Sequence, residues 1–288
     1  MKLRSLTLAL AAVLAACSGD NNATGNGETA NPATALELVA FAEASPGWTE
    51  ILGWDVDGEP CAWQGVVCEG GNLTTLNVSD SQLTGEIPTE LADLTNLSRL
   101  NLGGNELTGE IPVELGNLIT LNLSNNQLTG EIPAELGNHS DLDTLNLSNN
   151  QLTGEIPTEL GDLTNLARLN LRGNELTGEI PVEFGSLATL NLDDNQLTGE
   201  IPAALGELSN LATLSLRSNQ LTGEIPAELG NLTDLTTLNL NDNQLTGEVP
   251  DELQNLTNLT TLNLSNNEFT GEIPPELQAT TEDSAASE

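Results

Sequence analysis

The most regular feature of the chain is a short apolar pattern that returns at fixed spacing from Leu83 onward. The residues LTGEIP begin at Leu83 and return eight more times, with small variations, at intervals of 24 or 21 residues. Between two copies the pattern reads L-x-x-L-x-x-L-x-L-x-x-N, and apolar and polar residues alternate over the L-x-L stretch. This alternation predicts one short β-strand with one buried face in every unit.

Each unit needs its neighbours, because a single unit of this size cannot enclose its own apolar face. We therefore expect each unit to form one rung of a stack, with parallel strands about 4.8 Å apart. Four or five apolar side chains would be buried per rung, each contributing on the order of 1.5–3 kcal/mol. The Asn that ends each strand is predicted to pair with the backbone of adjacent turns in a buried ladder. The ladder comprises Asn105, Asn126, Asn150, Asn174, Asn195, Asn219, Asn243 and Asn267, with Ser81 in the first repeat.

Two units, which begin at Leu107 and Leu176, are three residues shorter than the others. The missing residues precede the strand, so we expect the loss to fall on the outer arc of the rung and to leave the sheet intact. Residues 83–151 and 152–220 align without gaps in the order long, short, long, which suggests duplication of a block of three repeats.

The first twenty residues, MKLRSLTLALAAVLAACSGD, have a basic start followed by a short apolar run. This run is too short to span a membrane and is typical of an export signal. Residues 14–17 (LAAC) resemble the lipobox of bacterial lipoproteins, which implies that Cys17 is lipidated and becomes the new N-terminus. The protein would then be exported and lipid-anchored in a bacterial cell envelope, at the outer membrane or cell surface. The alternative is an ordinary secretory signal.

If Cys17 carries lipid, two cysteines remain, Cys61 and Cys68. An even pair in an exported chain favours a disulfide, which would stabilise the fold by roughly 2–3 kcal/mol. The alternative is two free thiols.

The repeat L-x-G-x-I-P within 24 residues resembles the plant-type class of leucine-rich repeats, found in plant receptor kinases and polygalacturonase inhibitors. The stretch WDVDGEPCAWQGVVC is similar to the N-terminal cap of those proteins, and residues 36–41 match its preceding helix. The matching cap positions are Trp54, Cys61, Trp63, Gly65, Val66 and Cys68. The resemblance implies an α/β-type repeat fold: a right-handed leucine-rich-repeat solenoid of about nine repeats of 21–24 residues. It also implies a concave parallel β-sheet and a second short sheet along the LTGEIP flank.

These observations divide the chain into five segments. A helix is predicted in the cap because Leu36, Val39 and Ala40 recur at helical spacing. The segments are a signal peptide (1–16), the lipidated Cys with a flexible tether (17–31), the cap (32–72), the repeats (73–277) and a disordered acidic tail (278–288). No kinase sequence follows the repeats and no paired-Cys C-terminal cap is found, so signalling in the manner of plant receptors is not expected.

Charge excludes some classes of partner. The chain has 6 Lys+Arg against 43 Asp+Glu, and its formal net charge is −37. Nucleic acid and anionic lipid surfaces need a cationic footprint, so neither is an expected partner. Such acidity suits salty surroundings, where screening is strong.

The predicted strands present three columns of polar side chains on the sheet face. The second column is Asn on every rung except at Ser215. The first column is Thr75, Arg99, Thr120, Thr144, Arg168, Thr189, Thr213, Thr237 and Thr261. The third column is Ser79, Gly103, Ser124, Ser148, Arg172, Asp193, Arg217, Asn241 and Ser265.

All four arginines beyond the signal fall in these columns, which makes the sheet face the candidate binding surface. One interpretation is that Arg168, Arg172 and Arg217 contact carboxylates of a partner. The other is that Arg172, Asp193 and Arg217 pair with one another across consecutive strands. The candidate ligand-binding residues are Arg99, Arg168, Arg172, Arg217, Asp193, Thr144, Asn146, Thr189, Thr213 and Thr237.

A second charged feature is one Glu per rung in the TGE segment, the Glu column. It would either recruit divalent cations between rungs or form a solvated face, and we favour the solvated face because no calcium-loop motif occurs. Its members are Glu86, Glu110, Glu131, Glu155, Glu179, Glu200, Glu224, Glu248 and Glu272.

Catalysis is not expected, because common catalytic motifs are absent and His139, the single histidine, replaces a Leu on the outer arc. We expect no metal and no cofactor. The sequence favours a monomeric, non-enzymatic binding or adhesion module for a protein or glycan partner. The alternatives are a passive envelope scaffold and an ice-binding surface protein, the latter suggested by the regular Thr and Asn columns.

Overall fold

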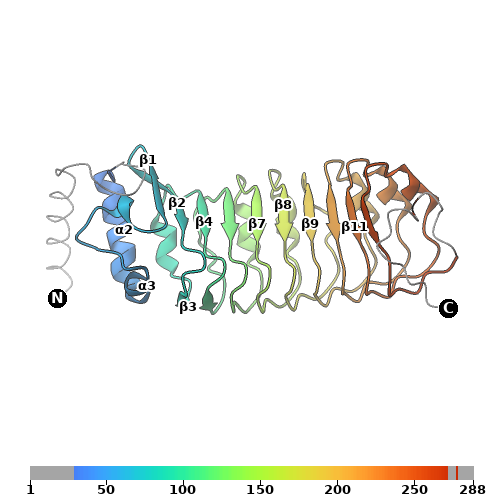
Figure 1. Cartoon of the computed structure of the whole chain (residues 1–288), viewed down its shortest axis with the longest axis horizontal. Helices are drawn as coiled ribbons and strands as arrows, with labels where there is room; N and C mark the ends of the chain where they lie inside the picture. The colour runs from blue at the N-terminus through green and yellow to red at the C-terminus, as the bar shows by residue number, and fades with distance from the viewer. Residues whose placement is uncertain (1–28, 272–276, 278–288) are drawn as a thin grey trace. The chain divides into compact units, whose positions relative to one another are not determined.

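The fold consists of short strands and turns repeated along the chain (Figure 1), and the computed structural model describes residues 29–271 and residue 277. It forms two compact units, one up to Gln127 and one from Leu128 onward. The predicted signal, Cys17 and nearly all of the tether lie outside the described residues, as does the predicted tail. No helix in the described part is both long enough and apolar enough to cross a membrane.

The first unit contains a sheet in the order β1-β2-β4-β6. Strand β1 runs antiparallel to β2, whereas β2, β4 and β6 are parallel. The register places Thr75 beside Arg99 and Arg99 beside Thr120, so the first column is confirmed in this unit. The strands are β1 (Val66–Glu69), β2 (Asn72–Asn77), β4 (Arg99–Asn101) and β6 (Thr120–Asn122).

The second unit contains six parallel strands in chain order. Each pairing between neighbouring strands aligns Thr or Arg with Thr or Arg, Leu with Leu, and Asn or Ser with Asn. The strands are short because the L-x-L alternation that defines them covers few residues before the turn. They are β7 (Thr144–Asn146), β8 (Arg168–Asn170), β9 (Thr189–Asn191), β10 (Thr213–Ser215), β11 (Thr237–Asn239) and β12 (Thr261–Asn263).

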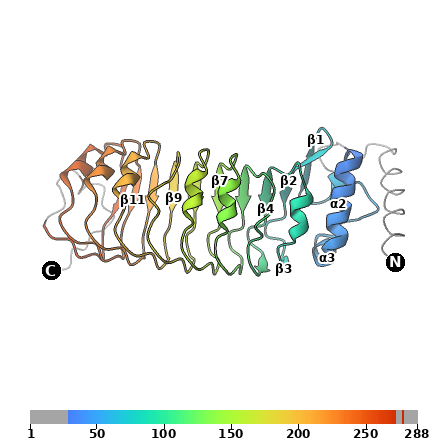
Figure 2. The same cartoon turned by 180° about the vertical axis from the view of Figure 1, so that it is seen from behind.

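Opposite the strands, most rungs carry one turn of 3-10 helix, visible from behind in Figure 2. The two short rungs, at Leu107 and Leu176, have none in the described structure. The prediction that the deletion falls on the outer arc is therefore confirmed. The helices are η2 (Thr89–Asp93), η3 (Ala134–Asn138), η4 (Thr158–Asp162), η5 (Ala203–Glu207), η6 (Ala227–Asn231) and η7 (Asp251–Asn255).

The core is a continuous filling of leucine and isoleucine inside each unit. Over one full rung seven apolar side chains are buried, more than the four or five expected, because the leucines of the outer arc are also enclosed. Those of one rung are Leu142, Leu145, Leu147, Leu152, Ile156, Leu160 and Leu163, none more than 3% exposed.

The predicted asparagine ladder is confirmed. In Asn195, Nδ2 donates to the carbonyl oxygens of Leu171 and Leu192 at 3.0 and 3.1 Å, and Oδ1 accepts from the N–H of Leu176 at 3.2 Å. One amide therefore satisfies backbone groups of two rungs where the strand hydrogen bonds have ended.

The LTGEIP flank forms the predicted second sheet only in part. In the first unit β3 (Thr84–Glu86) pairs in parallel with β5 (Glu106–Thr108). In the second unit the same segments make isolated parallel bridges, such as Glu155 with Thr177 and Glu200 with Thr222. The glycine between Thr and Glu has positive φ in both units, including Gly85 inside β3, and favours this conformation because it has no side chain.

The cap contains two helices, α2 (Pro32–Ala44) and α3 (Pro46–Leu52), and a single 3-10 turn η1 (Pro60–Ala62). Helix α2 was predicted and α3 was not. Asn31 caps α2, because its Oδ1 accepts from the N–H groups of Ala33 and Thr34 at 3.0 Å. The predicted disulfide between Cys61 and Cys68 is present.

The predicted buried face of α2 was partly wrong. Val39 is buried, but Leu36 is 36% exposed and Ala40 is exposed. The face that packs inward carries Leu38 and Phe41 instead, because Phe41 contacts the rings of Trp48 and Trp54. Trp54 in turn stacks on Trp63 with ring centroids 5.1 Å apart.

Candidate functional site

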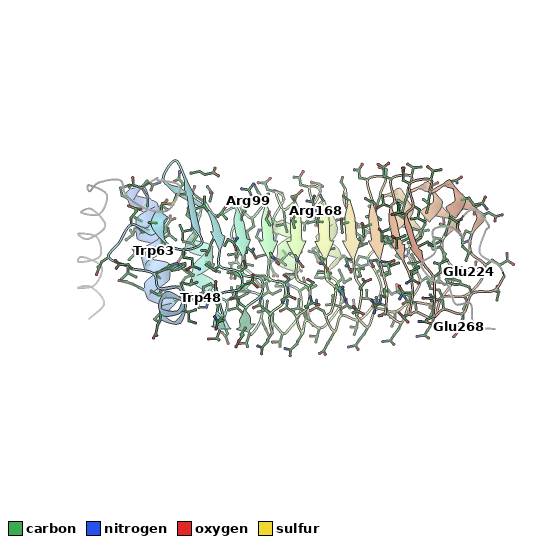
Figure 3. All side chains as sticks on the ribbon, in the orientation of Figure 1. Trp48, Trp63, Arg99, Arg168, Glu224 and Glu268 are labelled. Carbon is green, nitrogen blue, oxygen red and sulfur yellow. A yellow bond between two sulfur atoms is a disulfide. The ribbon has the colours of Figure 1, made fainter. Side chains whose placement is uncertain are left out.

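The sheet face carries the three predicted columns, and Figure 3 shows Arg99 at β4 and Arg168 at β8. Side chains of the first column stand on the face at each strand, with Thr144, Thr189, Thr213 and Thr237 half-buried and Arg168 exposed. Because adjacent strands are in register, like groups lie one rung apart within each unit. The face of the second unit is therefore a regular polar surface interrupted by arginine.

Some asparagine side chains of the second column form hydrogen bonds within the chain. The Oδ1 of Asn146 accepts from the N–H and the hydroxyl of Ser148 at 3.1 and 2.8 Å. Asn170 does the same for the N–H of Arg172 at 3.1 Å. These bonds close the turn that follows each strand, as Asx side chains commonly do. Asn146 thus holds the turn besides facing outward.

The third column is less exposed than the sequence suggested. Several of its members are buried, since the chain turns at this point and strict alternation no longer applies. Ser124, Ser148, Asp193 and Asn241 are buried, whereas Arg172 and Arg217 are exposed. The next residue on most rungs has positive φ, including Asp194 at 53° and Asp242 at 58°. Asn, Asp and Gly tolerate this conformation best, which accounts for the residue types at this position.

The arginines of the third column form a chain of ion pairs across the second unit. Arg172 Nε lies 3.1 Å from Asp194 Oδ2, and Arg217 lies 4.0 Å from Asp194 and 3.7 Å from Asp242. Positive and negative side chains therefore alternate across the rungs, as expected. The negative groups, however, are the carboxylates of Asp194 and Asp242. The prediction that Asp193 pairs with these guanidinium groups was wrong.

Asp193 instead lies below the face, 6% exposed. Its Oδ1 accepts from the backbone N–H of Arg217 at 2.8 Å. Burial raises the pKa of this carboxyl above its usual value, although hydrogen bonds from Ser215 and Arg217 oppose the change. Asp193 therefore joins two rungs and does not offer its carboxylate to a partner.

Arg168 has a separate partner. Its NH1 group lies 3.5 Å from Asp143, and the hydroxyl of Thr144 donates to the same carboxylate oxygen at 2.7 Å. The Arg168 side chain is 61% exposed, so this pair holds the guanidinium loosely. Sequence reasoning missed Asp143, Asp194 and Asp242. Asp194 and Asp242 could have been found from the sequence, because each directly follows a residue of the third column and its side chain lies beside the arginines of that column.

The remaining chemical candidate from the sequence is the single histidine, His139. His139 is buried at the C-terminal end of η3, away from the strands, as its place in the repeat predicted. Among the residues that the structure describes, no group of three or more His, Cys, Asp or Glu side chains could hold a metal ion.

Stacked leucine-filled rungs, an asparagine ladder and a disulfide-linked cap define a plant-type leucine-rich-repeat solenoid. Comparison with known families agrees, and the chain belongs to the leucine-rich repeat family. One family description, Leucine rich repeat, matches residues 185–245. A second, Leucine Rich Repeat, matches residues 72–94, 96–118, 117–139, 141–163, 165–187 and 258–279.

Similar proteins include plant receptors. The ectodomain of the Arabidopsis receptor kinase HAESA, solved with a peptide hormone, is 34% identical over 88% of this chain and 45% of its own, with a TM-score of 0.80. A probable inactive receptor kinase of Arabidopsis thaliana is 42% identical over 52 residues, 18% of this chain and 8% of the relative. The chain thus spans less than half of either relative. A plant ice-binding protein is 32% identical over 86% of this chain and 90% of its own, with a TM-score of 0.71.

Proposed function

We propose that this protein is a lipid-anchored, non-enzymatic binding module of a bacterial cell envelope, and that its sheet face holds an acidic segment of a protein partner. The HAESA ectodomain, which shares this fold, was solved with a peptide hormone, and that supports a protein partner here. The localisation rests on the LAAC sequence that ends at Cys17.

The observation that carries the proposal is the position of Arg168, Arg172 and Arg217. On a chain of net charge −37, these cations gather on the sheet face of one unit, with side chains 46–61% exposed. Exposed ion pairs contribute only about 0–1 kcal/mol, so a partner can displace them at little cost. A guanidinium group has five N–H donors and binds a carboxylate through two of them, which favours an acidic partner.

The proposal is tested by capture of partners from envelope extracts with the chain from Ser18 onward. The triple variant R168A/R172A/R217A should recover its partner at least about tenfold less well, since two or three charge-assisted contacts are lost. Asn210→Ala, at an exposed position of the outer arc away from the sheet face, is the control and should recover it normally. Equal recovery by the triple variant would remove the arginines from the binding surface.

The same experiment separates a protein from a glycan partner. Protease treatment of the captured material should abolish rebinding if the partner is a protein, whereas an acidic glycan would survive it. For the anchor, cells fed a labelled fatty acid should label the protein, and Cys17→Ser should remove the label. An unlabelled wild-type protein would contradict the lipid anchor and leave the binding proposal standing.

Ice binding is a second candidate, favoured by the similarity to a plant ice-binding protein over 90% of that protein. The first column offers Thr189, Thr213 and Thr237 on adjacent registered strands, a regular array of hydroxyl and methyl groups. Arg168 interrupts this array, which is why we place the candidate second. Thermal hysteresis of the purified protein tests it directly, and its absence would exclude ice binding.

A further inference from the structure

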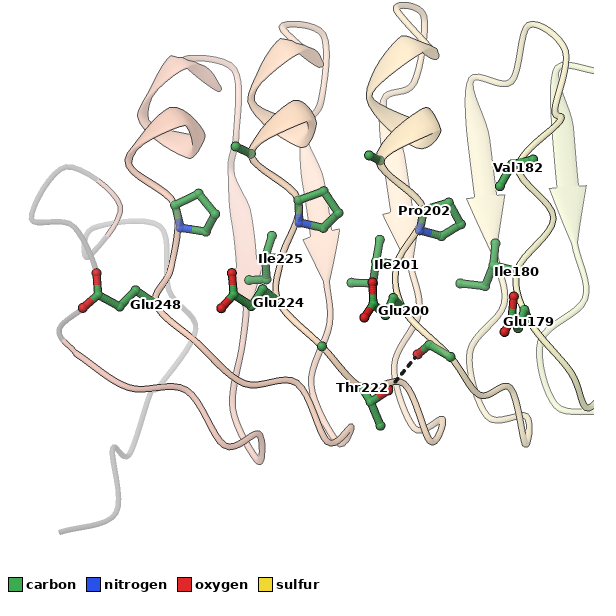
Figure 4. A pocket seen from close by; sticks show the side chains of 16 residues that line it. Glu179, Ile180, Val182, Glu200, Ile201, Pro202, Thr222, Glu224, Ile225 and Glu248 are labelled. Carbon is green, nitrogen blue, oxygen red and sulfur yellow. Dashed lines mark hydrogen bonds between the residues drawn. The ribbon is translucent and has the colours of Figure 1, made fainter.

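The flank of the second unit contains a groove that the sheet-face proposal does not use. It encloses about 1320 Å³ and follows the LTGEIP segments of four successive rungs, from Glu179 to Pro250 (Figure 4). Every one of these rungs contributes a Glu, and the two middle rungs also contribute Ile and Pro. The first rung adds Ile180 and Val182, and the last adds Pro250. The carboxylates of the groove therefore repeat with a period of one rung.

Apolar side chains form the floor and one wall of the groove. Ile201 and Ile225 are buried beneath it, and Pro202 and Pro226 are half-buried beside it. At one end lies Val182, which is 54% exposed, the most exposed large apolar side chain in the described structure. The same repeat position is exposed on the rungs that carry a 3-10 helix, but there it holds Thr, Ala or Asp, so Val182 adds an exposed apolar side chain.

The carboxylates of the Glu column line the same groove, one on each rung. Each Glu stem lies across the glycine of the next rung: a Cβ at Gly223 would come within 2.8 Å of Glu200 Cγ, and one at Gly247 within 2.7 Å of Glu224 Cγ. The glycines therefore allow the stems to pack and hold the carboxylates at the rung spacing. No Lys or Arg lines the groove, so its charge is complementary to a cation.

Backbone groups along the groove are already paired between rungs. The N–H of Thr222 donates to the carbonyl of Gly199, and the N–H of Thr246 to that of Gly223, both at 2.8 Å. An extended peptide binds a strand mainly through free backbone groups, and these positions do not offer them. The occupant must be recognised by apolar contact and by charge.

We propose that the groove binds a linear aliphatic polyamine, with its methylene groups on the proline and valine side chains and its ammonium groups against the carboxylates. The spacing supports this class. Two amines joined by three methylene groups span about 5 Å when extended, from ordinary single-bond lengths. Successive rungs lie about 4.8 Å apart. A triamine with three-carbon spacers would thus place one ammonium group on each of three rungs.

The test is calorimetric titration of the full-length protein with norspermidine, a triamine with three-carbon spacers. We expect saturable binding that weakens about tenfold in E200Q/E224Q, since two ammonium–carboxylate pairs are lost. The matched control is E131Q/E155Q, which removes two carboxylates from the same column outside the groove and should bind within about twofold of wild type. Equal weakening in both variants would overturn the proposal, because binding would then follow net charge alone.

Spacer length and apolar contact are tested separately. A triamine of equal charge with six-carbon spacers should bind several-fold more weakly. Its neighbouring ammonium groups would lie about two rungs apart and would leave the carboxylate of the rung between them without a partner. Val182→Ser should also weaken norspermidine binding while leaving every carboxylate in place. If both triamines bind equally and Mg²⁺ at equal charge displaces them, the groove only condenses counterions and the proposal fails. None of these outcomes depends on the sheet-face arginines.

Discussion

Each ladder asparagine forms hydrogen bonds to several backbone groups through one side chain. Asn195 satisfies two carbonyl oxygens and one N–H that are enclosed between rungs, and its own side chain is 8% exposed. No other short side chain offers two donors and an acceptor in this geometry. This explains why Asn recurs at the position while neighbouring residues vary.

Asn195→Ala should therefore be strongly destabilising. Each buried backbone group left unsatisfied costs about 1–3 kcal/mol, so we expect a loss of at least about 3 kcal/mol in the free energy of unfolding. Urea unfolding followed by circular dichroism would measure it. Asn210→Ala, at an exposed position of the outer arc, is the control and should lie within about 0.5 kcal/mol of wild type. A ladder variant as stable as this control would contradict the role assigned to the amide.

Asp193 predicts a pH dependence with a definite sign. Its pKa is raised by burial, so the native state holds this proton more tightly than the unfolded chain does. Protein stability then falls as the pH rises from about 4 through the raised pKa of Asp193. Asp193→Asn keeps an acceptor oxygen for the Arg217 N–H but does not titrate.

The measurement is urea unfolding of wild type and D193N at a series of pH values from about 3.5 to 7. The difference in unfolding free energy, variant minus wild type, should grow with pH and then level off. The many other carboxylates titrate in both proteins and cancel in this difference. Parallel curves across the whole range would show that Asp193 has an ordinary pKa in the folded protein.

At the scale of elements, the 3-10 helices set how closely successive rungs approach. Gly206 in η5 faces the backbone of the next rung, where a Cβ would overlap the carbonyl oxygen of Glu228. Gly161 in η4 is similar, with a Cβ position 2.6 Å from the carbonyl oxygen of Glu183. At Gly161 and Gly206 the absence of a side chain thus allows the next rung to pack closely against the 3-10 helix.

We expect Gly206→Ala to cost about 2 kcal/mol or more, because the clash is with backbone and must be relieved by separating two rungs. Thermal unfolding would measure the loss. Gly47→Ala in α3 is the control, since nothing lies within 4 Å of its Cβ position, and alanine there should be neutral or stabilising by up to about 1 kcal/mol. Equal stability of the two variants would mean that the rungs are not in close contact at Gly206.

The elements that sequence predicted well are those in which one local pattern determines one local structure. The alternation of apolar and polar residues predicted the strands, and the Asn that recurs from the second repeat onward predicted the ladder. Prediction failed where tertiary contacts decide. Leu36 fits a helical apolar face, yet the rings around Phe41 determine which side of α2 is buried. Asp193 and Asp194 are adjacent and chemically identical, and only the positive φ at Asp194 separates the buried carboxylate from the paired one.

At the scale of the whole molecule, charge opposes the compact state. With 43 acidic and 6 basic residues, folding brings like charges together, and the Glu column adds one carboxylate per rung. Repulsion between exposed charges is screened over about 10 Å at 0.1 M salt and about 3 Å at 1 M. The stability of this protein should therefore depend on salt more than that of a balanced chain.

We expect the free energy of unfolding to rise by about 2 kcal/mol or more between 0.05 and 1 M NaCl, a shift of several degrees in the thermal midpoint. Urea unfolding at several NaCl concentrations would measure it, because urea itself carries no charge. Sucrose, which stabilises without screening, serves as the control. A variant with six Glu→Gln changes in the Glu column should show a smaller response to NaCl. A free energy of unfolding that does not change with NaCl concentration would show that repulsion between the carboxylates does not destabilise the folded protein.

Strand β1 runs antiparallel to β2, and this reversal limits where new repeats can be added to the chain. The other strand pairings within each unit are parallel and nearly interchangeable, so an additional coil placed among them would meet the same kind of neighbour on both sides. The reversed strand accepts only one kind of neighbour. Gene duplication can therefore lengthen this protein from within, by whole coils, while its amino-terminal boundary stays fixed.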